Sequence, residues 1–151
     1  SRGRFANVAQ LAEVSEIFSA VGAVLTVPEK QMDAVTAVSG SGPAYFFLMV
    51  EAVVDAGVAA GLPRPVATEL AAQTMAGAAA MLLDRMTESG SGSVVGPLDT
   101  SAAQLRASVT SPGGTTAAGL RELERGGLRS AVASAVEAAK TRSEQLRITS
   151  E

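Results

Sequence analysis

The stretch PAYFFLMVEAVVDAGVAA, residues 43–60, decides the fold. It is long enough for about five helical turns, a proline opens it and Gly61 follows its end. Only Glu51 and Asp55 interrupt its apolar character, and their four-residue spacing places both carboxylates on one face. A helix that is apolar almost all round has to be buried. In a chain of 151 residues, the neighbours that bury it can belong to a second subunit.

Helical patterns fill most of the chain on either side of this stretch. Asn7, followed three residues later by Gln10, has the pattern of a capping box at the start of a helix. We expect helices at about 7–22, 28–38, 43–60, 65–86, 101–109, 115–125 and 128–147, with a short strand or extended link at 23–27 and a Gly/Ser-rich loop at 88–100. The sequence therefore predicts an all-α fold of six to seven helices.

Composition excludes several classes of function. The chain has no cysteine and no histidine, which removes disulfides, thiolate nucleophiles, Ser-His-Asp triads and most catalytic zinc sites. Its net charge is −3 and no basic run is present, so we expect no nucleic-acid partner. The two carboxylates in the most apolar helix argue against a membrane span. We expect no metal site.

Two glycine-rich segments open onto helices. TSPGGTT, residues 110–116, is a tight turn before one helical pattern, and SGSGPAY, residues 39–45, precedes another. Backbone N–H groups at such a turn and at a helix N-terminus carry partial positive charge, which makes a small anion site suited to a carboxylate. A plain helix stop followed by a new N-cap explains each segment locally as well.

Five blocks of sequence carry a resemblance to a known family. They are DAVTAVSGSGPAY at 33–45, GLPR at 61–64, AAQT at 71–74, TSPGGTT at 110–116 and GGLRSAV at 126–132. In this order they resemble pyrroline-5-carboxylate reductase, from about Gly3 to about Leu146. The resemblance covers only the C-terminal, helical half of that family, and the N-terminal nucleotide-binding half is absent. The loop at 88–100 is longer than the family usually has.

The resemblance implies roles for specific residues. In the family, the loop matching 111–116 takes the substrate carboxylate on backbone N–H groups, which gives the substrate-binding set Ser111, Gly113, Gly114, Thr115 and Thr116. Thr116 matches the residue whose hydroxyl meets the ring nitrogen, so it is the expected catalytic residue. The residues expected nearest the nicotinamide are Ser41, Gly42, Pro43 and Val109.

The resemblance also implies an activity and an assembly. Members of the family are cytoplasmic oxidoreductases acting on a CH–NH bond, and they reduce 1-pyrroline-5-carboxylate to L-proline in proline biosynthesis. The cofactor is NADPH or NADH, bound mainly by the absent half. Residues 1–27 would form the link and first helix, 28–147 an interleaved helical dimerisation and substrate domain, and 148–151 a tail. The expected assembly is a homodimer, with five dimers forming a decamer in the family, and the fragment alone is expected to be inactive.

Other interpretations stay open at this stage. A non-catalytic helical assembly module explains the apolar helix without any ligand, although it has no need of two glycine-rich anion sites. The helical half of another hydroxyacid or imine dehydrogenase would rely on a Lys or His, and neither Lys30 nor Lys140 sits beside a glycine-rich segment. The GSGSVVG run at 90–96 has the wrong spacing for a dinucleotide loop and no strand before it. The resemblance leaves both NADPH and NADH open as the cofactor.

Overall fold

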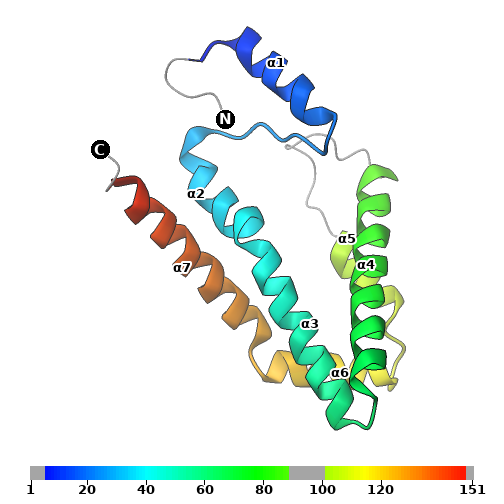
Figure 1. Ribbon diagram of the computed structural model, residues 1–151. Coiled ribbons are helices and arrows are strands. Elements are labelled where there is room, and N and C mark those ends of the chain that lie inside the picture. Colours follow the sequence, from blue (N-terminus) through cyan, green and yellow to red (C-terminus); the bar gives the residue numbers. More distant parts are fainter. Residues whose placement is uncertain (1–5, 89–100, 149–151) are drawn as a thin grey trace. The chain divides into compact units, whose positions relative to one another are not determined.

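A computed structural model describes residues 6–88 and 101–148, all of whose regular elements are helical (Figure 1). The α-helices are α1 Val8–Ser19, α2 Met32–Val35, α3 Gly42–Ala59, α4 Arg64–Glu88, α5 Ser101–Ser108, α6 Thr115–Arg125 and α7 Leu128–Ile148, with a 3₁₀ turn, η1, at Glu29–Gln31 and a π-helical turn, η2, at Thr36–Gly40. The all-α prediction is confirmed. The expected loop at 88–100 lies almost entirely outside the described residues.

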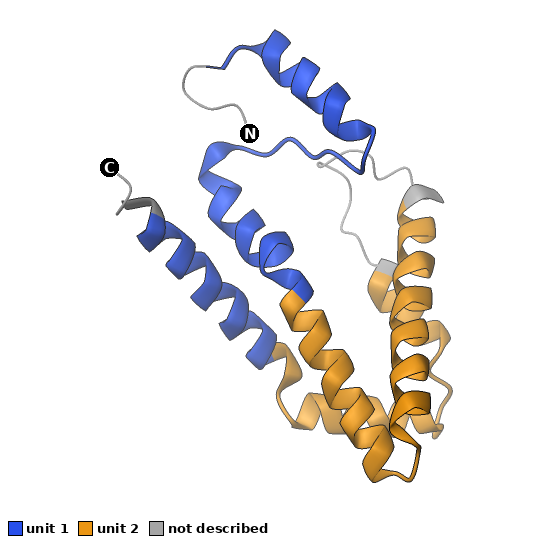
Figure 2. Cartoon of the chain, in the orientation of Figure 1, with its two compact units in different colours: residues 1–43, 130–151 blue, residues 44–129 orange. Residues whose placement is uncertain are grey.

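The chain divides into two compact units, residues 1–43 with 130–151 and residues 44–129 (Figure 2). In the first unit, α1 begins with the predicted capping box. The Asn7 side chain accepts from the Gln10 N–H at 2.8 Å, and the Gln10 side chain accepts from the Asn7 N–H at 3.0 Å. The expected single helix over 28–38 is instead η1, α2 and η2 in succession, and residues 23–27 form no regular element.

The second unit is built on the pair α3 and α4. Gly61 adopts φ +103, and the N–H groups of Gly61 and Leu62 donate to the carbonyls of Val58 and Gly57, which ends α3 in a Schellman motif. Pro63 directly precedes α4 and Pro65 lies in its first turn, where missing N–H groups are not needed. The turn brings the two helices together in an antiparallel arrangement (Figure 1).

Small residues let α3 and α4 approach closely. A Cβ built on Gly57 would lie 3.3 Å from the Ala67 Cβ, which is tighter than ordinary contact. Val54, Ala67 and Ala71 form the buried cluster between the helices, with Val50 and Val58 packed against it. Asp55 pairs with Arg64 at 2.8 Å across the turn.

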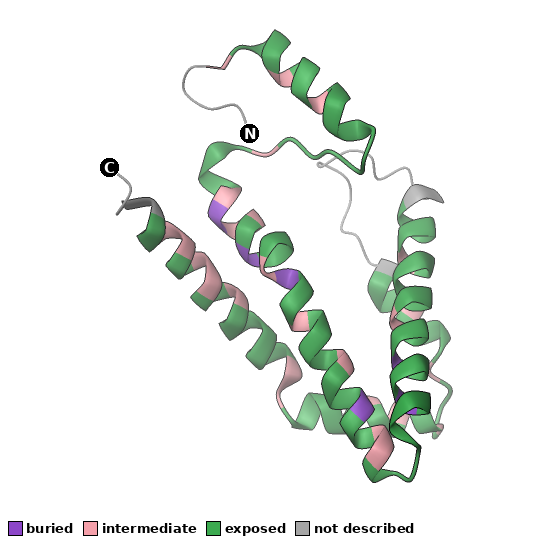
Figure 3. Cartoon of the chain, viewed as in Figure 1, coloured by how far each residue is buried: buried purple, intermediate pink, exposed green. Residues whose placement is uncertain are grey.

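Most large apolar side chains of α3 lie outside this small core. Phe47 and Leu48 are each 66% exposed in the single chain, and most of the helix has the colour of exposed residues in Figure 3. Among the described residues, the helical stretches 29–59 and 64–86 are long and apolar enough to span a membrane by length and composition alone. A helix buried between subunits of an assembly meets the same criterion. The rest of this chain thus does not bury α3, although the apolar sequence of the helix predicts that it is buried.

Candidate functional site

A tight turn joins α5 to α6. Ser111 accepts the Gly114 N–H on its carbonyl at 3.1 Å, Pro112 occupies the second position, and Gly113 adopts φ +69 at the third. Proline followed by a left-handed glycine is the signature of a type II turn, in which the third residue needs a positive φ. The backbone path therefore accounts for Pro112 and Gly113 without any ligand.

Gly114 closes the turn and caps α6. It is extended, with φ −79 and ψ 174, and no side chain caps the helix. A Cβ at this position would collide with the Ser111 Oγ and lie 3.3 Å from the Ser111 carbonyl oxygen. Because the glycine permits this close approach, the turn folds directly against the first residue of the helix.

The first turn of α6 presents unused donors. The N–H groups of Thr115, Thr116 and Ala117 have no acceptor within the helix, and no hydrogen bond to them occurs in the described part of the chain. Within the same ranges, the hydroxyls of Thr115, Thr116 and Ser111 also make no hydrogen bond, and all three residues are exposed. The geometry can therefore receive an anion with backbone donors and offers hydroxyls beside it.

The structure refines which groups can act as donors in this segment. The Gly114 N–H already donates within the turn, so Gly114 contributes the cap geometry. Ala117, which the sequence analysis did not name, supplies a third open N–H. Its position as the third residue of the predicted helix was the available signal, because the first N–H groups of any helix lack intrahelical partners.

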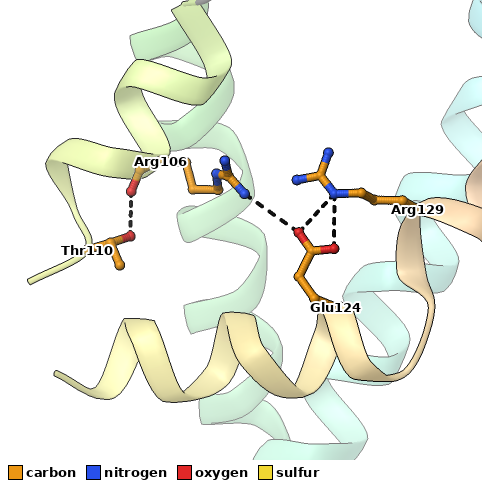
Figure 4. Close-up of polar contacts among 4 residues, drawn as sticks. All are labelled: Arg106, Thr110, Glu124 and Arg129. Carbon is orange, nitrogen blue, oxygen red and sulfur yellow. Dashed lines mark hydrogen bonds and ion pairs between the residues drawn. The ribbon is translucent and has the colours of Figure 1, made fainter. Parts of the chain in front are cut away.

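Polar contacts surround the turn. The Thr110 hydroxyl donates to the Arg106 carbonyl at 2.5 Å, which closes the end of α5 (Figure 4). The Glu124 carboxylate of α6 lies 3.7 Å from an Arg106 nitrogen and accepts from the Arg129 Nε at 2.8 and 3.0 Å. Val109 exposes 59% of its surface at the start of the turn.

The second glycine-rich segment lies in the other unit for most of its length. The η2 turn leads into it through a π-type bond of 2.9 Å from the Ser41 N–H to the Thr36 carbonyl. The Ser39 hydroxyl donates to the Val35 carbonyl at 2.9 Å, while the Ser41 hydroxyl makes no hydrogen bond among the described residues. Ser41 is half-buried, Gly42 is buried and Pro43 is exposed. Isolated π turns are rare and occur often at functional sites.

A buried carboxylate precedes this segment in the chain. Asp33 of α2 is 8% exposed, and its Oδ1 accepts from the Ser143 hydroxyl of α7 at 2.8 Å. Nearby, Lys140 contacts Glu144 at 3.0 Å and Glu137 at 3.9 Å. The hydrogen bond to Glu144, then the charges of Glu137 and Glu144, raise the pKa of Lys140 above its ordinary value of 10.5.

An apolar groove of about 370 Å³ runs between α3 and α4. Its walls include Phe46, Met49, Val53, Leu70 and Met75, and Thr74 is the one polar side chain among the lining residues. Such a groove has no charge partner for a small anion, and its shape and chemistry suit another apolar helix. The described residues contain no cluster of acidic side chains able to hold a metal ion.

Comparison with known proteins decides the family. The model of pyrroline-5-carboxylate reductase dimerisation matches residues 29–146, which is most of the chain. The chain belongs to this family. Among relatives, the pyrroline-5-carboxylate reductase of Mycobacterium leprae is 70% identical over the whole chain and 53% of its own length. The enzyme of Mycobacterium tuberculosis H37Rv is 68% identical, with 52% of its length covered.

Solved reductase structures share the fold. A pyrroline-5-carboxylate reductase from Coxiella burnetii matches with a TM-score of 0.79 and 36% identity, covering 95% of this chain and 49% of that one. The Plasmodium falciparum pyrroline carboxylate reductase with NADP bound matches with a TM-score of 0.75 and 36% identity, covering 95% and 52%. The chain thus spans about half the length of the family members that it matches.

Proposed function

We propose that this chain is the C-terminal dimerisation and substrate-binding half of a cytoplasmic pyrroline-5-carboxylate reductase, an enzyme that reduces 1-pyrroline-5-carboxylate to L-proline. The observation that carries the proposal is the first turn of α6, with its three open N–H groups behind a type II turn, in a chain of this family. Residues 28–147 form the functional domain, 1–27 link it to a nucleotide-binding half, and 148–151 form a tail.

The substrate is a small cyclic imine with one carboxylate and one ring nitrogen. Its carboxylate is received by the N–H groups at the start of α6, with Ser111, Gly113, Gly114 and Thr115 shaping that cradle. The Thr116 hydroxyl, which makes no hydrogen bond among the described residues, meets the ring nitrogen. This hydroxyl orients the imine through a hydrogen bond to the ring nitrogen, and it keeps that contact when the nitrogen becomes an amine.

When bound, a nicotinamide would supply hydride to the imine carbon, and a proton taken up at nitrogen would complete the amine. The residues of this chain that fit such a cofactor are Val109, whose exposed side chain offers an apolar contact, and Ser41, whose hydroxyl is unused within the described ranges. Gly42 and Pro43 shape the backbone beside Ser41. No side-chain base of the histidine type is needed, because the cofactor carries the chemistry and the protein supplies orientation and charge placement.

Assembly as a homodimer accounts for the exposed apolar surface. A second copy would cover the groove between α3 and α4, together with the exposed side chains of Phe47 and Leu48. A decamer of five dimers is the larger form that the family resemblance suggests. Light scattering is expected to give a dimer or larger species, and a stable monomer at low micromolar concentration would contradict this assembly.

Titration of the ¹⁵N-labelled chain with L-proline tests the substrate site without any cofactor. Chemical-shift changes are expected to concentrate on the amides of Thr115, Thr116 and Ala117, and pyrrolidine, which lacks the carboxylate, is expected to leave them unchanged. Changes confined to the α3–α4 groove, or equal changes with both compounds, would refute the site. The isolated chain is expected not to oxidise NADPH.

The second candidate is a helical assembly module without catalysis. It is favoured by the extent of exposed apolar surface on α3, which needs only a partner and no ligand. The two candidates separate in the proline titration, because an assembly module binds neither proline nor the imine. They also separate when the chain is joined to a nucleotide-binding half, since only the reductase gains turnover.

A further inference from the structure

One carboxylate connects three helices around the turn at 109–114. Glu124, near the end of α6, contacts Arg106 of α5 and Arg129 at the start of α7 (Figure 4). Both guanidinium groups approach the same oxygen, Oε1, at 3.7 and 2.8 Å. All three residues belong to the unit 44–129, and the turn leaves α5 and enters α6 within that unit.

Arg106 acts on the turn through two different groups. Its carbonyl accepts the Thr110 hydroxyl at 2.5 Å, which fixes the residue that follows Val109. Its guanidinium reaches Glu124, which fixes the end of α5 relative to α6. One contact thus fixes the start of the turn to the last turn of α5, and the other holds α5 against the far end of α6.

The arrangement contains two positive charges and one negative charge. Exposed ion pairs of this kind add little to global stability because water screens them. Removal of the carboxylate, however, leaves two guanidinium groups facing each other with no counter-charge between them. The contact that ties α5 to α6 is then lost, and the turn between these helices loses that constraint.

We propose that Glu124 is a positioning residue that sets the geometry of the turn preceding α6. Through Arg106 it holds the backbone donors of α6 and the Ser111–Gly114 turn in the arrangement that receives the substrate carboxylate. This role rests on the proposed reductase function, in which that turn binds the imine. The charged residues around Glu124 in the sequence do not indicate its contact with α5.

Glu122 provides a matched control on the same helix. Its carboxylate is also exposed and is also paired with an arginine, Arg125, at 2.6 Å. That pair lies within α6 and connects it to no other helix. Glu122→Gln therefore removes the same charge and the same type of interaction without releasing α5.

The first arm of the test uses this chain and needs no activity. Amide exchange is measured by NMR at Thr110 and Gly114, whose N–H groups donate to the Ala107 and Ser111 carbonyls at 3.1 Å. Glu124→Gln is expected to speed exchange at these two amides by about tenfold or more, while Glu122→Gln leaves them unchanged. Equal rates in the two variants would overturn the proposal, and so would faster exchange spread evenly over all helices.

The second arm uses the chain joined behind the nucleotide-binding half of its Mycobacterium leprae relative. Glu124→Gln is expected to lower kcat/KM for the imine about tenfold and to leave the KM for NADPH within twofold. Arg106→Met is expected to have a similar effect, and the double variant is expected to be no worse than either single one. An equal loss for imine and NADPH, or no loss, would overturn the positioning role. If the unaltered fusion has no turnover, the proposed function fails, and the exchange arm still decides whether Glu124 sets the turn.

Discussion

Replacing Gly114 by alanine tests the close turn that the site depends on. The backbone there is extended, so alanine meets no conformational penalty. Any change in the free energy of unfolding therefore comes from steric contact of the new Cβ with its neighbours. The new Cβ would collide with the Ser111 Oγ, which can rotate away, but would also lie 3.3 Å from the Ser111 carbonyl, which is held by the turn's own hydrogen bond. Overpacking costs about 1–3 kcal/mol, and an exposed turn can relax toward the lower end, near ~1 kcal/mol.

Urea denaturation measures this change against an internal control. Gly119 lies inside α6, the helix that Gly114 caps, and a Cβ built on Gly119 would have no other atom within 4 Å. Gly119→Ala is therefore expected to stabilise the chain by about 1 kcal/mol. The two glycine-to-alanine changes on α6 are thus predicted to have opposite signs. Adding Ser111→Ala to Gly114→Ala is expected to restore part of the loss, because it removes the colliding oxygen. If Gly114→Ala stabilises the chain as much as Gly119→Ala does, the close contact between Gly114 and Ser111 does not exist in solution.

Three further outcomes are expected. In an active fusion, Thr116→Ala is expected to lose the hydroxyl contact and to lower kcat/KM about 5- to 150-fold, which corresponds to ~1–3 kcal/mol. Thr115→Ala is expected to lower kcat/KM much less. The reverse order of the two effects in folded protein would contradict the assignment. Val53→Asp is expected to abolish the soluble dimer in light scattering while Val53→Ala retains it, and a dimer that survives both changes would place the interface elsewhere. Ser143→Ala is expected to lower the free energy of unfolding by about 1–3 kcal/mol, since buried Asp33 loses a donor, and an unchanged urea midpoint would argue against that buried bond.

The helical framework could be predicted from sequence wherever local signals agreed. The bounds of α6, Thr115–Arg125, coincide with the prediction, because a glycine turn precedes the helix and glycines follow it. The capping box at Asn7 was likewise visible as a spacing. The segment 28–38 was predicted in the wrong form, since the spacing of apolar residues does not distinguish an α-helix from the 3₁₀, α and π turns that replace it.

Long-range pairs account for most of what sequence could not predict. Asp55 pairs with Arg64 across the α3–α4 turn, a contact that the helical spacing of Asp55 and Glu51 does not indicate. Glu124 is exposed among charged neighbours on α6, and nothing in those neighbours indicates that Arg106 lies close by. Such contacts depend on how helices pack after the turns have formed, and periodicity within one helix carries no information about them.

Turnover by a fusion tests the central claim most directly. The chain is joined behind the nucleotide-binding half of its Mycobacterium leprae relative, and NADPH oxidation is followed with 1-pyrroline-5-carboxylate as substrate. The fusion is expected to oxidise NADPH and to form L-proline in equal amount, and Thr116→Ala is expected to reduce the rate. A soluble, dimeric fusion that binds NADPH but forms no proline would contradict the assignment of this chain as the substrate-binding half of the reductase.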